Sequence, residues 1–374
     1  MSSINNYMLK NTPEIVSISS LESPEHARQK DPKILTMTWM IGKRCNYDCS
    51  YCPSWLHDSF SPHMHIDDIK NVVDSITDWT LSNDKQLKII FTGGEPFIHP
   101  KFLDVIEYIK EKNNIHSIGV HTNGSASLNT YLKFSNYLSN ISVSLHLEES
   151  NSIIEETIKK IDYINKNTNM FINVNLMAVP EKIGEVSIIC NILKEKNIKF
   201  SIESIDVVEH NDKSNRKIPR KIYKKNKKYF DNISTEQRIT DKESITNERL
   251  DRYYTKDQLE FLKEHQNSTM WQDTKVYYES HTEETNSATL LTNRLTNFLG
   301  WYCYIGIDSI YIDHDGLIYR GNCQAGKHIG HVSDSKIQWP KEPITCPYNI
   351  CSCQTDIRIR KIKNLHYIDN IVDN

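Results

Sequence analysis

The sequence predicts an α/β protein: a partial (βα)6 TIM-like barrel followed by a small cysteine-rich α+β module near the C-terminus. Short apolar runs alternate with helical patterns between residues 34 and 205, which is typical of a parallel sheet wound by right-handed crossovers. Six such units favour an open barrel, and the loops at the carboxyl ends of its strands carry the chemistry. Beyond residue 297 the composition changes, because five of the nine cysteines lie between Cys303 and Cys353.

The predicted strands are short and apolar, and the segments between them have helical spacing. Ile66, Ile69, Val73 and Ile76, for example, recur at three- and four-residue spacing and indicate an amphipathic helix. The strands are predicted at 34–41, 87–91, 115–121, 141–146, 170–177 and 198–205, and the other helices at 102–112, 128–137, 153–164 and 186–194.

The chain divides into five predicted segments. Residues 1–33 have little apolar periodicity and are expected to form a flexible or loosely docked arm. Residues 34–206 form the barrel core, and residues 207–296 form a polar insertion over the barrel mouth, with one helix at 256–265. Residues 297–356 form the cysteine-rich module, and residues 357–374 form a tail. Within the module, an Asp-Gly pair between two short apolar runs (309–313 and 317–319) predicts a β-hairpin.

The composition describes a globular protein, with 38% hydrophobic and 25% charged residues. A net charge of −3 gives no overall field that would attract nucleic acid or a membrane surface. The sequence has no apolar run of 18 residues and no secretory signal order at the N-terminus, so we expect a cytoplasmic location without a membrane anchor. Clustered cysteines in that reducing compartment bind metal more often than they form disulfides.

The first cysteine group, Cys45-x3-Cys49-x2-Cys52, follows the first predicted strand directly. Three thiolates on one short loop can bind three corners of an iron–sulfur cubane. With only three ligands nearby, one iron stays open to a bidentate small ligand, as a catalytic metal keeps a free position. The alternative is a structural zinc loop that borrows a distant histidine.

This spacing, with the aromatic Tyr51 before the last cysteine, resembles the signature of the radical S-adenosylmethionine (SAM) superfamily. The resemblance implies that Cys45, Cys49 and Cys52 hold a [4Fe–4S] cluster whose open iron binds SAM, and that Tyr51 lies against the adenine. It also implies reductive cleavage of SAM to a 5′-deoxyadenosyl radical, which takes a hydrogen atom from the substrate. A flavodoxin- or ferredoxin-like electron donor is the partner that such a reaction needs.

Gly93-Gly94-Glu95 closes the second predicted strand, where glycines allow the backbone to approach a ligand closely. A tight strand-to-helix turn explains the same residues. The triplet resembles the family segment that binds the methionyl amine of SAM. The carboxylate of Glu95 can accept a hydrogen bond from such an amine. Asn123 closes the third strand and resembles a frequent family element, and an Asn-Gly loop turn is the equal alternative.

The fourth strand carries the next candidates. If Val143, Leu145 and Leu147 face the helices, then Ser144, His146 and Glu148 face the barrel interior. The resemblance makes Ser144 a ribose contact and His146 a contact to SAM or substrate, and a buried, hydrogen-bonded core histidine is the alternative for His146. Asn173, Asn175 and Met177 alternate in the same way on the fifth strand, where the sequence departs from the glycine-containing adenine motif of many relatives.

Five cysteines make up the second group, with the predicted hairpin between the first two. Four thiolates gathered around a hairpin form a closed cage, which is what a non-catalytic cluster needs. The arrangement resembles the SPASM and Twitch extensions, and it implies one auxiliary [4Fe–4S] cluster, as in the Twitch type. Which cysteine is spare stays open, and a zinc site is the alternative. The candidate ligands are Cys303, Cys323, Cys346, Cys351 and Cys353.

A basic run at 213–228 contains nine Lys or Arg residues. Such a run can bind the phosphates of RNA or of a nucleotide-linked sugar, and the alternative is a solvated, lysine-rich linker. The preferred prediction is a radical SAM enzyme that performs a net oxidation, either peptide maturation or sugar or alcohol dehydrogenation. The alternatives are a non-catalytic iron–sulfur or zinc protein that binds RNA, and a radical SAM enzyme that acts on RNA or a nucleotide-linked sugar. Nucleic acid is the less favoured partner, because acidic residues follow the basic run.

Overall fold

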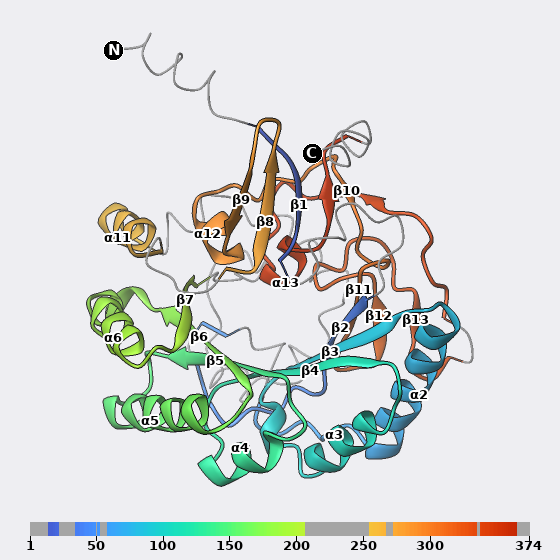
Figure 1. Ribbon diagram of the computed structural model, residues 1–374, viewed down its shortest axis with the longest axis horizontal. Helices are drawn as coiled ribbons and strands as arrows, with labels where there is room; N and C mark the ends of the chain where they lie inside the picture. The colour runs from blue at the N-terminus through green and yellow to red at the C-terminus, as the bar shows by residue number, and fades with distance from the viewer. Residues whose placement is uncertain are drawn as a thin grey trace.

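A nine-stranded sheet forms the centre of the molecule in the computed structural model, which describes residues 14–21, 34–49, 51–52, 58–205, 254–266, 272–334 and 337–364. The strand order is β13-β12-β11-β2-β3-β4-β5-β6-β7, and the six strands from β2 to β7 run parallel. Figure 1 shows this sheet as an arc with α2 to α6 along its outer side. The mixed α/β fold with a parallel sheet is therefore confirmed.

The barrel strands and the four helices predicted with bounds begin and end within three residues of the predicted positions, and α2 contains the predicted apolar positions from Ile66 to Ile76 and continues to Ser82. Each strand is followed by a helix, except that β7 (Lys199–Ser204) leads into residues outside the described part of the chain. The other strands are β2 (Ile34–Met40), β3 (Gln86–Thr92), β4 (Ile115–Thr122), β5 (Asn140–His146) and β6 (Phe171–Ala178); the helices are α2 (Ile66–Ser82), α3 (Phe102–Lys110), α4 (Leu128–Phe134), α5 (Asn151–Asn167) and α6 (Ile183–Glu195).

The two faces of the parallel sheet differ in chemistry. Leu35, Ile89 and Leu176 are fully buried and belong to the apolar core between the sheet and its helices. Their neighbours along the strands point the other way, because successive side chains alternate across a sheet. That inner face is rich in serine, asparagine and charged residues, such as Ser142 and Asn173, and it supplies the walls of the cavities described below.

A second, six-stranded sheet with the order β14-β10-β15-β1-β8-β9 lies across the open side of the arc (Figure 1). β1 (Ile15–Ser20) occupies its middle and pairs antiparallel with β15 (Lys361–Ile362) and with β8 (Thr274–Tyr278). The expectation of a loosely docked arm is therefore wrong for residues 15–20. Val16 and Ile18 are buried there, and Ser17 Oγ donates a 2.9 Å hydrogen bond to the carbonyl of Lys361.

The predicted insertion also contributes to this sheet. β8 pairs with β9 (Thr282–Thr285), and α12 (Ser287–Thr292) follows. α11 (Lys256–Gln266) is the helix predicted at 256–265. Just before it, the Tyr254 hydroxyl donates to the carbonyl of Ala178 at 2.6 Å and accepts from the amide of Ile205 at 2.8 Å. The basic run at 213–228 lies outside the described residues.

The predicted hairpin is present as β11 (Ser309–Ile312) and β12 (Leu317–Tyr319), with Gly316 at a φ of +88° in the turn. Its sheet partner was not predicted: β11 pairs parallel with β2, so the cysteine-rich module extends the barrel sheet. β12 continues to β13 (Gly330–His331). The remaining short elements are β10 (Tyr302–Cys303), β14 (Ile344–Thr345) and α13 (Gln354–Ile357).

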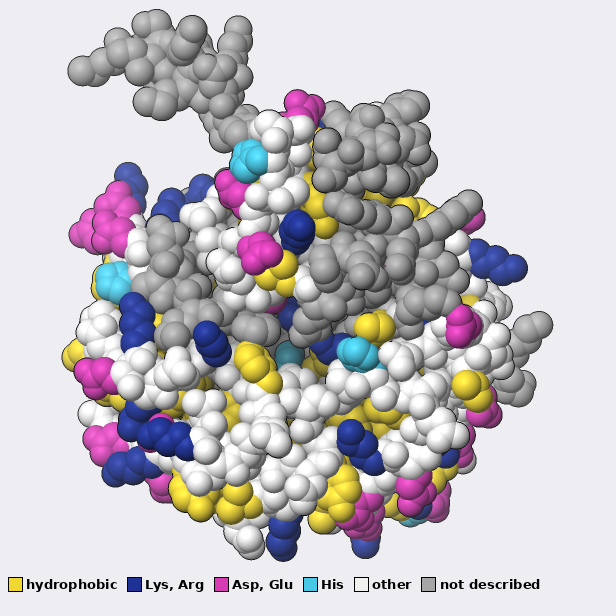
Figure 2. Space-filling view, viewed as in Figure 1, with side chains coloured by type: hydrophobic (Ala, Val, Ile, Leu, Met, Phe, Trp, Pro, Cys, Tyr) yellow, Lys and Arg dark blue, Asp and Glu magenta, His cyan; other side chains and the backbone are white. Residues whose placement is uncertain are grey.

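The surface carries charges of both signs. On the face shown in Figure 2, Lys and Arg side chains are interspersed with Asp and Glu side chains over the described residues. No helix in the described part of the chain is both long and apolar enough to cross a membrane.

Candidate active site

The first cysteine group lies on the connection that leaves the carboxyl end of β2. The amide of Cys45 donates to the carbonyl of Asp58 at 2.7 Å, and the amide of Asp58 donates to the carbonyl of Lys43 at 2.9 Å, which closes the base of the loop. The Asp58 carboxylate accepts from the amides of Phe60 and Ser61 and from the Ser61 hydroxyl. Burial raises the pKa of Asp58, but these hydrogen bonds outweigh it, so the net shift is downward and the carboxylate is ionised.

The three cysteines border one cavity of about 270 Å³. Cys45 and Cys49 are buried and Cys52 is half-buried. The amide of Tyr47 donates to Cys45 Sγ at 3.4 Å, an interaction that favours a thiolate there. Among the described residues, Cys45, Cys49 and Cys52 are the cysteines that line this cavity, and no fourth one does. A donor set of three soft thiolates fits a [4Fe–4S] cluster with one iron left for an exogenous ligand.

Gly93 and Gly94 line the same cavity and also hold the cysteine loop in place. Gly93 has a φ of +137°, and a Cβ atom there would lie 2.4 Å from the carbonyl oxygen of Gly42. A Cβ atom on Gly94 would lie 2.0 Å from the carbonyl oxygen of Arg44. The close approach seen here is to the protein's own backbone, which leads into Cys45; the predicted approach to a ligand stays a prediction.

Glu95 lies behind the cavity and is only 3% exposed. Its carboxylate accepts from the hydroxyl of Thr122 at 2.9 Å and from the amides of Phe97 and Asn123 at 3.0 and 2.7 Å. Burial raises the pKa of Glu95 to about 7 in spite of these hydrogen bonds. The structure thus connects Glu95 to Asn123, and Glu95 is not among the described residues that line the cavity.

Asn123 lies in a turn, as one of its two predicted interpretations has it, and it lines the cavity, while a contact with SAM stays a prediction. Gly124 follows at a φ of +77°, which gives the turn. The Asn123 side-chain nitrogen donates to Asn46 Oδ1 at 2.9 Å and lies 3.7 Å from Cys45 Sγ. The end of β4 is therefore linked directly to the cysteine loop.

Ser144 and His146 both line the cavity, and Val143 and Leu145 face the apolar core as predicted. His146 Nδ1 lies 3.4 Å from Cys49 Sγ and hydrogen-bonds the Tyr51 hydroxyl, so this histidine is tied to the cysteine loop. Burial lowers the pKa of His146 to about 4, which keeps the ring neutral at pH 7. Glu148, predicted to face the interior, is exposed and is not a described lining residue, because the strand ends at His146.

Two further residues reach the cavity. Met177 continues the inward alternation of β6, and His121 does the same near the end of β4. His121 was not predicted as a site residue, although its place at the carboxyl end of a predicted strand is a usable signal. Burial, followed by the charges of Arg358 and Lys88, lowers the pKa of His121 to about 4.

The second cysteine group gathers around a buried lysine. Lys361 is 1% exposed, and its ammonium donates to the carbonyls of Ile357 and Ile359 at 3.1 Å each. Burial alone would lower the pKa of Lys361, but Cys303, Cys351, Asp356 and Cys346 together raise it. Burial also raises the pKa of Cys323, and Asp356, Cys351 and Cys303 add to that effect.

Cys353 lies at the edge of this group. Its Sγ accepts a 3.2 Å hydrogen bond from the Asn322 side chain, and Asn322 also donates its amide to Asp356 at 3.1 Å. The structure therefore places Cys303, Cys346 and Cys351 in one buried cluster with Cys323 packed against it, and Cys353 acts electrostatically on Cys351. In the described part of the chain, no three His, Cys, Asp or Glu side chains converge as they would on a single metal ion.

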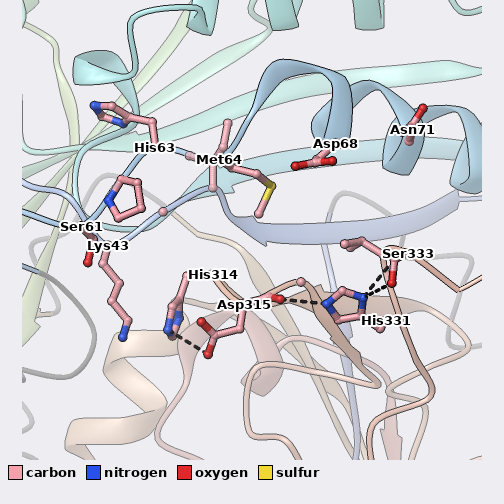
Figure 3. Close-up of a pocket in the computed structure, with 15 residues that line it drawn as sticks. Lys43, Ser61, His63, Met64, Asp68, Asn71, His314, Asp315, His331 and Ser333 are labelled. Atoms are coloured by element: carbon pink, nitrogen blue, oxygen red, sulfur yellow. Dashed lines mark hydrogen bonds and ion pairs between the residues drawn. The ribbon is translucent and has the colours of Figure 1, made fainter. Parts of the chain in front are cut away.

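A separate cavity of about 470 Å³ lies between the β2–α2 connection and the β11–β12 hairpin (Figure 3). Lys43 and His63 face it from the connection, and His314 faces it from the hairpin. His314 Nε2 lies 3.2 Å from Asp315 Oδ2. The described residues that line this cavity include none of those predicted to bind SAM.

Comparisons with known proteins agree with this site. Residues 39–171 match the family model of the radical SAM superfamily. The chain is 37% identical over 85 residues to GTP 3′,8-cyclase of Haemophilus ducreyi, a match that covers 22% of this chain and 24% of that protein. It is 30% identical over 125 residues to S-adenosylmethionine-dependent nucleotide dehydratase RSAD2 of Danio rerio, covering 32% of this chain and 33% of that protein.

The chain thus matches about a quarter to a third of the length of these curated relatives. Among solved structures, native anSMEcpe with bound AdoMet aligns with a TM-score of 0.50 and 14% identity, covering 80% of this chain and 78% of that one, so the two share a fold. The matched segment 39–171 contains all three cysteines of the first group and the Gly93–Glu95 segment. Over this segment, which includes the three-cysteine loop at the carboxyl end of β2, the chain is similar to the radical SAM superfamily.

Proposed function

We propose that this chain is a radical SAM enzyme whose Cys45, Cys49 and Cys52 hold a [4Fe–4S] cluster and whose adjoining cavity binds SAM. The observation that supports it is one cavity of about 270 Å³ bordered by three thiols at the carboxyl edge of a parallel sheet. When bound, the cluster and SAM supply a 5′-deoxyadenosyl radical by reductive cleavage, with the electron coming from a flavodoxin- or ferredoxin-like donor.

The protein's own residues bind and orient in this proposal. The backbone at Gly93 and Gly94 approaches the cavity closely enough to receive the amino acid part of SAM. Tyr51 and Ser144 flank the adenosine part, and His146 holds Tyr51 in place through its ring nitrogen. Glu95 is a positioning residue here, because it fixes the Thr122–Asn123 backbone that contacts the cysteine loop.

We further propose that Cys303, Cys323, Cys346 and Cys351 hold one auxiliary [4Fe–4S] cluster, as in Twitch-type extensions, and that Cys353 is the spare cysteine. Cys303, Cys346 and Cys351 act electrostatically on Lys361, and Cys303 and Cys351 act on Cys323. Cys353 acts on Cys351 as well, but its Sγ accepts a hydrogen bond from Asn322, and this is why we choose it as the spare cysteine. A buried ammonium beside them would offset the negative charge of a thiolate-ligated cluster.

An auxiliary cluster favours a net oxidation of the substrate, because it offers an acceptor for the electron left after hydrogen abstraction. Peptide maturation and sugar or alcohol dehydrogenation both fit such an oxidation. The similarity to a GTP cyclase and a nucleotide dehydratase adds nucleotide-like small molecules to the candidate substrates.

Anaerobic reconstitution tests the proposal directly. We expect about eight irons per chain from two cubanes, and 5′-deoxyadenosine after addition of SAM and dithionite. The Cys45→Ala, Cys49→Ala, Cys52→Ala triple variant should keep about four irons and make no 5′-deoxyadenosine. Zinc in both cysteine sites, or no consumption of SAM by the reconstituted wild type, would show that the chain is not a radical SAM enzyme.

A further inference from the structure

A third cavity, of about 380 Å³, lies against the inner face of the parallel sheet. His121 lines both this cavity and the one bordered by the three cysteines, so the two adjoin. The walls come from inward-facing side chains of β3 to β7 and from Asp273, Asn286 and residues 354–358 of the C-terminal part. The volume falls within the range of about 300–1,000 Å³ that is usual for small-molecule pockets.

The wall formed by β5, β6 and β7 is neutral and polar. Asn173 and Asn175 each donate to Ser142 Oγ, at 3.0 and 3.1 Å, and Ser201 Oγ donates to Asn175 Oδ1 at 3.2 Å. Burying amides and hydroxyls costs free energy unless they are hydrogen-bonded, so a sheet face that only filled space would be apolar. Such a row offers donors and acceptors to a hydroxyl- or amide-bearing molecule.

The opposite wall carries positive charge. Lys88 on β3 is 9% exposed, and Arg358 faces the same cavity. One carboxylate, Asp273, serves both cations: its Oδ2 lies 3.6 Å from Arg358 Nη1, and it also accepts from Ser287 and Thr274. Burial lowers the pKa of Lys88 to about 7, with Arg358 adding to the shift and Asp273 opposing it.

The neighbouring Glu203, His116 and His121 are at most partly charged near neutral pH. Burial raises the pKa of Glu203 to about 7, so this carboxyl is only partly ionised near neutral pH. Burial also lowers the pKa of His116 and His121, so both rings are mostly neutral at pH 7. With a pKa of about 7, Lys88 is itself only partly protonated near neutral pH. An anion bound in this buried, low-dielectric cavity would favour the charged form of Lys88 and would also face the Arg358 guanidinium.

We propose that this cavity binds the substrate through an oxyanion, a phosphate or carboxylate group held by Lys88 and Arg358, with the polar body of the molecule against the asparagines and serines of β5 to β7. The identification of the bound molecule as the substrate rests on the proposed function; the oxyanion site itself does not. Because His121 borders both cavities, a molecule held here lies next to the place where SAM is proposed to bind.

Calorimetric titration of the full chain, without SAM or reductant, tests the oxyanion site. The phosphate probes are inorganic phosphate and pyrophosphate, and the carboxylate probes are acetate and citrate. We expect one class to bind, and we expect Lys88→Met and Arg358→Gln each to weaken that binding at least about tenfold, or about 1.4 kcal/mol. Lys110→Met, at the exposed end of α3, is the matched control and should bind like wild type.

The outcome separates the two substrate chemistries and the two proposals. Binding of the phosphate probes alone identifies a phosphorylated substrate, and binding of the carboxylates alone identifies a carboxylic acid. Arg358→Lys keeps the charge but loses the planar guanidinium fork, so it should bind more weakly than wild type and more tightly than Arg358→Gln, which separates loss of a cation from misfolding. The site is overturned if wild type binds no probe up to about 10 mM. It is also overturned if Lys88→Met and Arg358→Gln both bind the probe with the affinity of wild type. Failure of wild type to cleave SAM, with oxyanion binding intact, contradicts only the proposed function.

Discussion

Glu203 on β7 carries a buried carboxylate that joins the barrel interior to the C-terminal module. Its Oε1 accepts from Ser201 Oγ at 2.5 Å, and its Oε2 accepts from the side chain of Gln354, which follows Cys353. Burial raises the pKa of Glu203 from 4.5 to about 7, since the charged form loses hydration that its hydrogen bonds only partly replace. The folded state therefore prefers the protonated carboxyl, whereas the unfolded chain ionises it near pH 4.5.

This preference makes stability depend on pH. The contribution of protonated Glu203 is fully present below pH 4.5 and is lost as the pH rises through about 7. Glu203→Gln keeps the size and polarity but cannot ionise, so its free energy of unfolding should exceed that of wild type by up to about 3 kcal/mol above pH 7 and match it near pH 4.5. Urea denaturation of both proteins at pH 5 and pH 8 measures the difference. An equal gap at the two pH values would contradict the prediction.

At the scale of the elements, the site depends on how β3 ends against the cysteine loop. The periodicity of the sequence placed β3, and β2 before the cysteine loop, correctly, because each strand buries one apolar face locally. That Gly94 packs on the carbonyl of Arg44 was beyond the sequence, since a Gly-Gly pair indicates a close approach without saying to what.

Gly94→Ala should therefore displace the cysteine loop. Its Cβ would lie 2.0 Å from the carbonyl oxygen of Arg44, and the three nearest atoms are all backbone atoms of Lys43 and Arg44, which cannot move aside as a flexible side chain could. We expect the reconstituted variant to lose about four of about eight irons and all SAM cleavage, while the second cysteine group keeps its cluster. Gly184→Ala in α6 is the control, because nothing lies within 4 Å of the added methyl, and a helix gains about 0.5–1 kcal/mol from alanine. Full iron content in the Gly94 variant would show that the loop tolerates the methyl group.

At the scale of the whole molecule, the two ends of the chain stabilise one another. β1 lies between β15 and β8, so the described N-terminal strand completes a sheet made otherwise of residues beyond 273. β11 in turn pairs with β2, which attaches the cysteine-rich module to the barrel. We therefore expect the barrel and module to unfold together.

Ile18→Ala tests this coupling. Ile18 is 0% exposed in the core of the second sheet, so its truncation should lower the free energy of unfolding by about 2–5 kcal/mol. Ile188→Ala, at a side chain 60% exposed on α6, should change it by less than about 0.5 kcal/mol. Guanidinium unfolding followed by far-ultraviolet circular dichroism measures both. Two separate transitions in the Ile18 variant would show that the module unfolds independently of the barrel.

The sequence by itself determined the parallel βα repeat, the hairpin at Gly316 and the two cysteine groups, because each is written in short-range spacing or in a single turn. The tertiary structure alone decided where β1 lies, that β11 joins β2, and that Lys361 sits among the second group of thiols. It also decided that Glu95 turns toward Thr122 and Asn123, and that Lys88 and Arg358, 270 residues apart, face one cavity. These are pairings between distant segments, and local periodicity fixes which face of a strand is buried but not which other segment covers it.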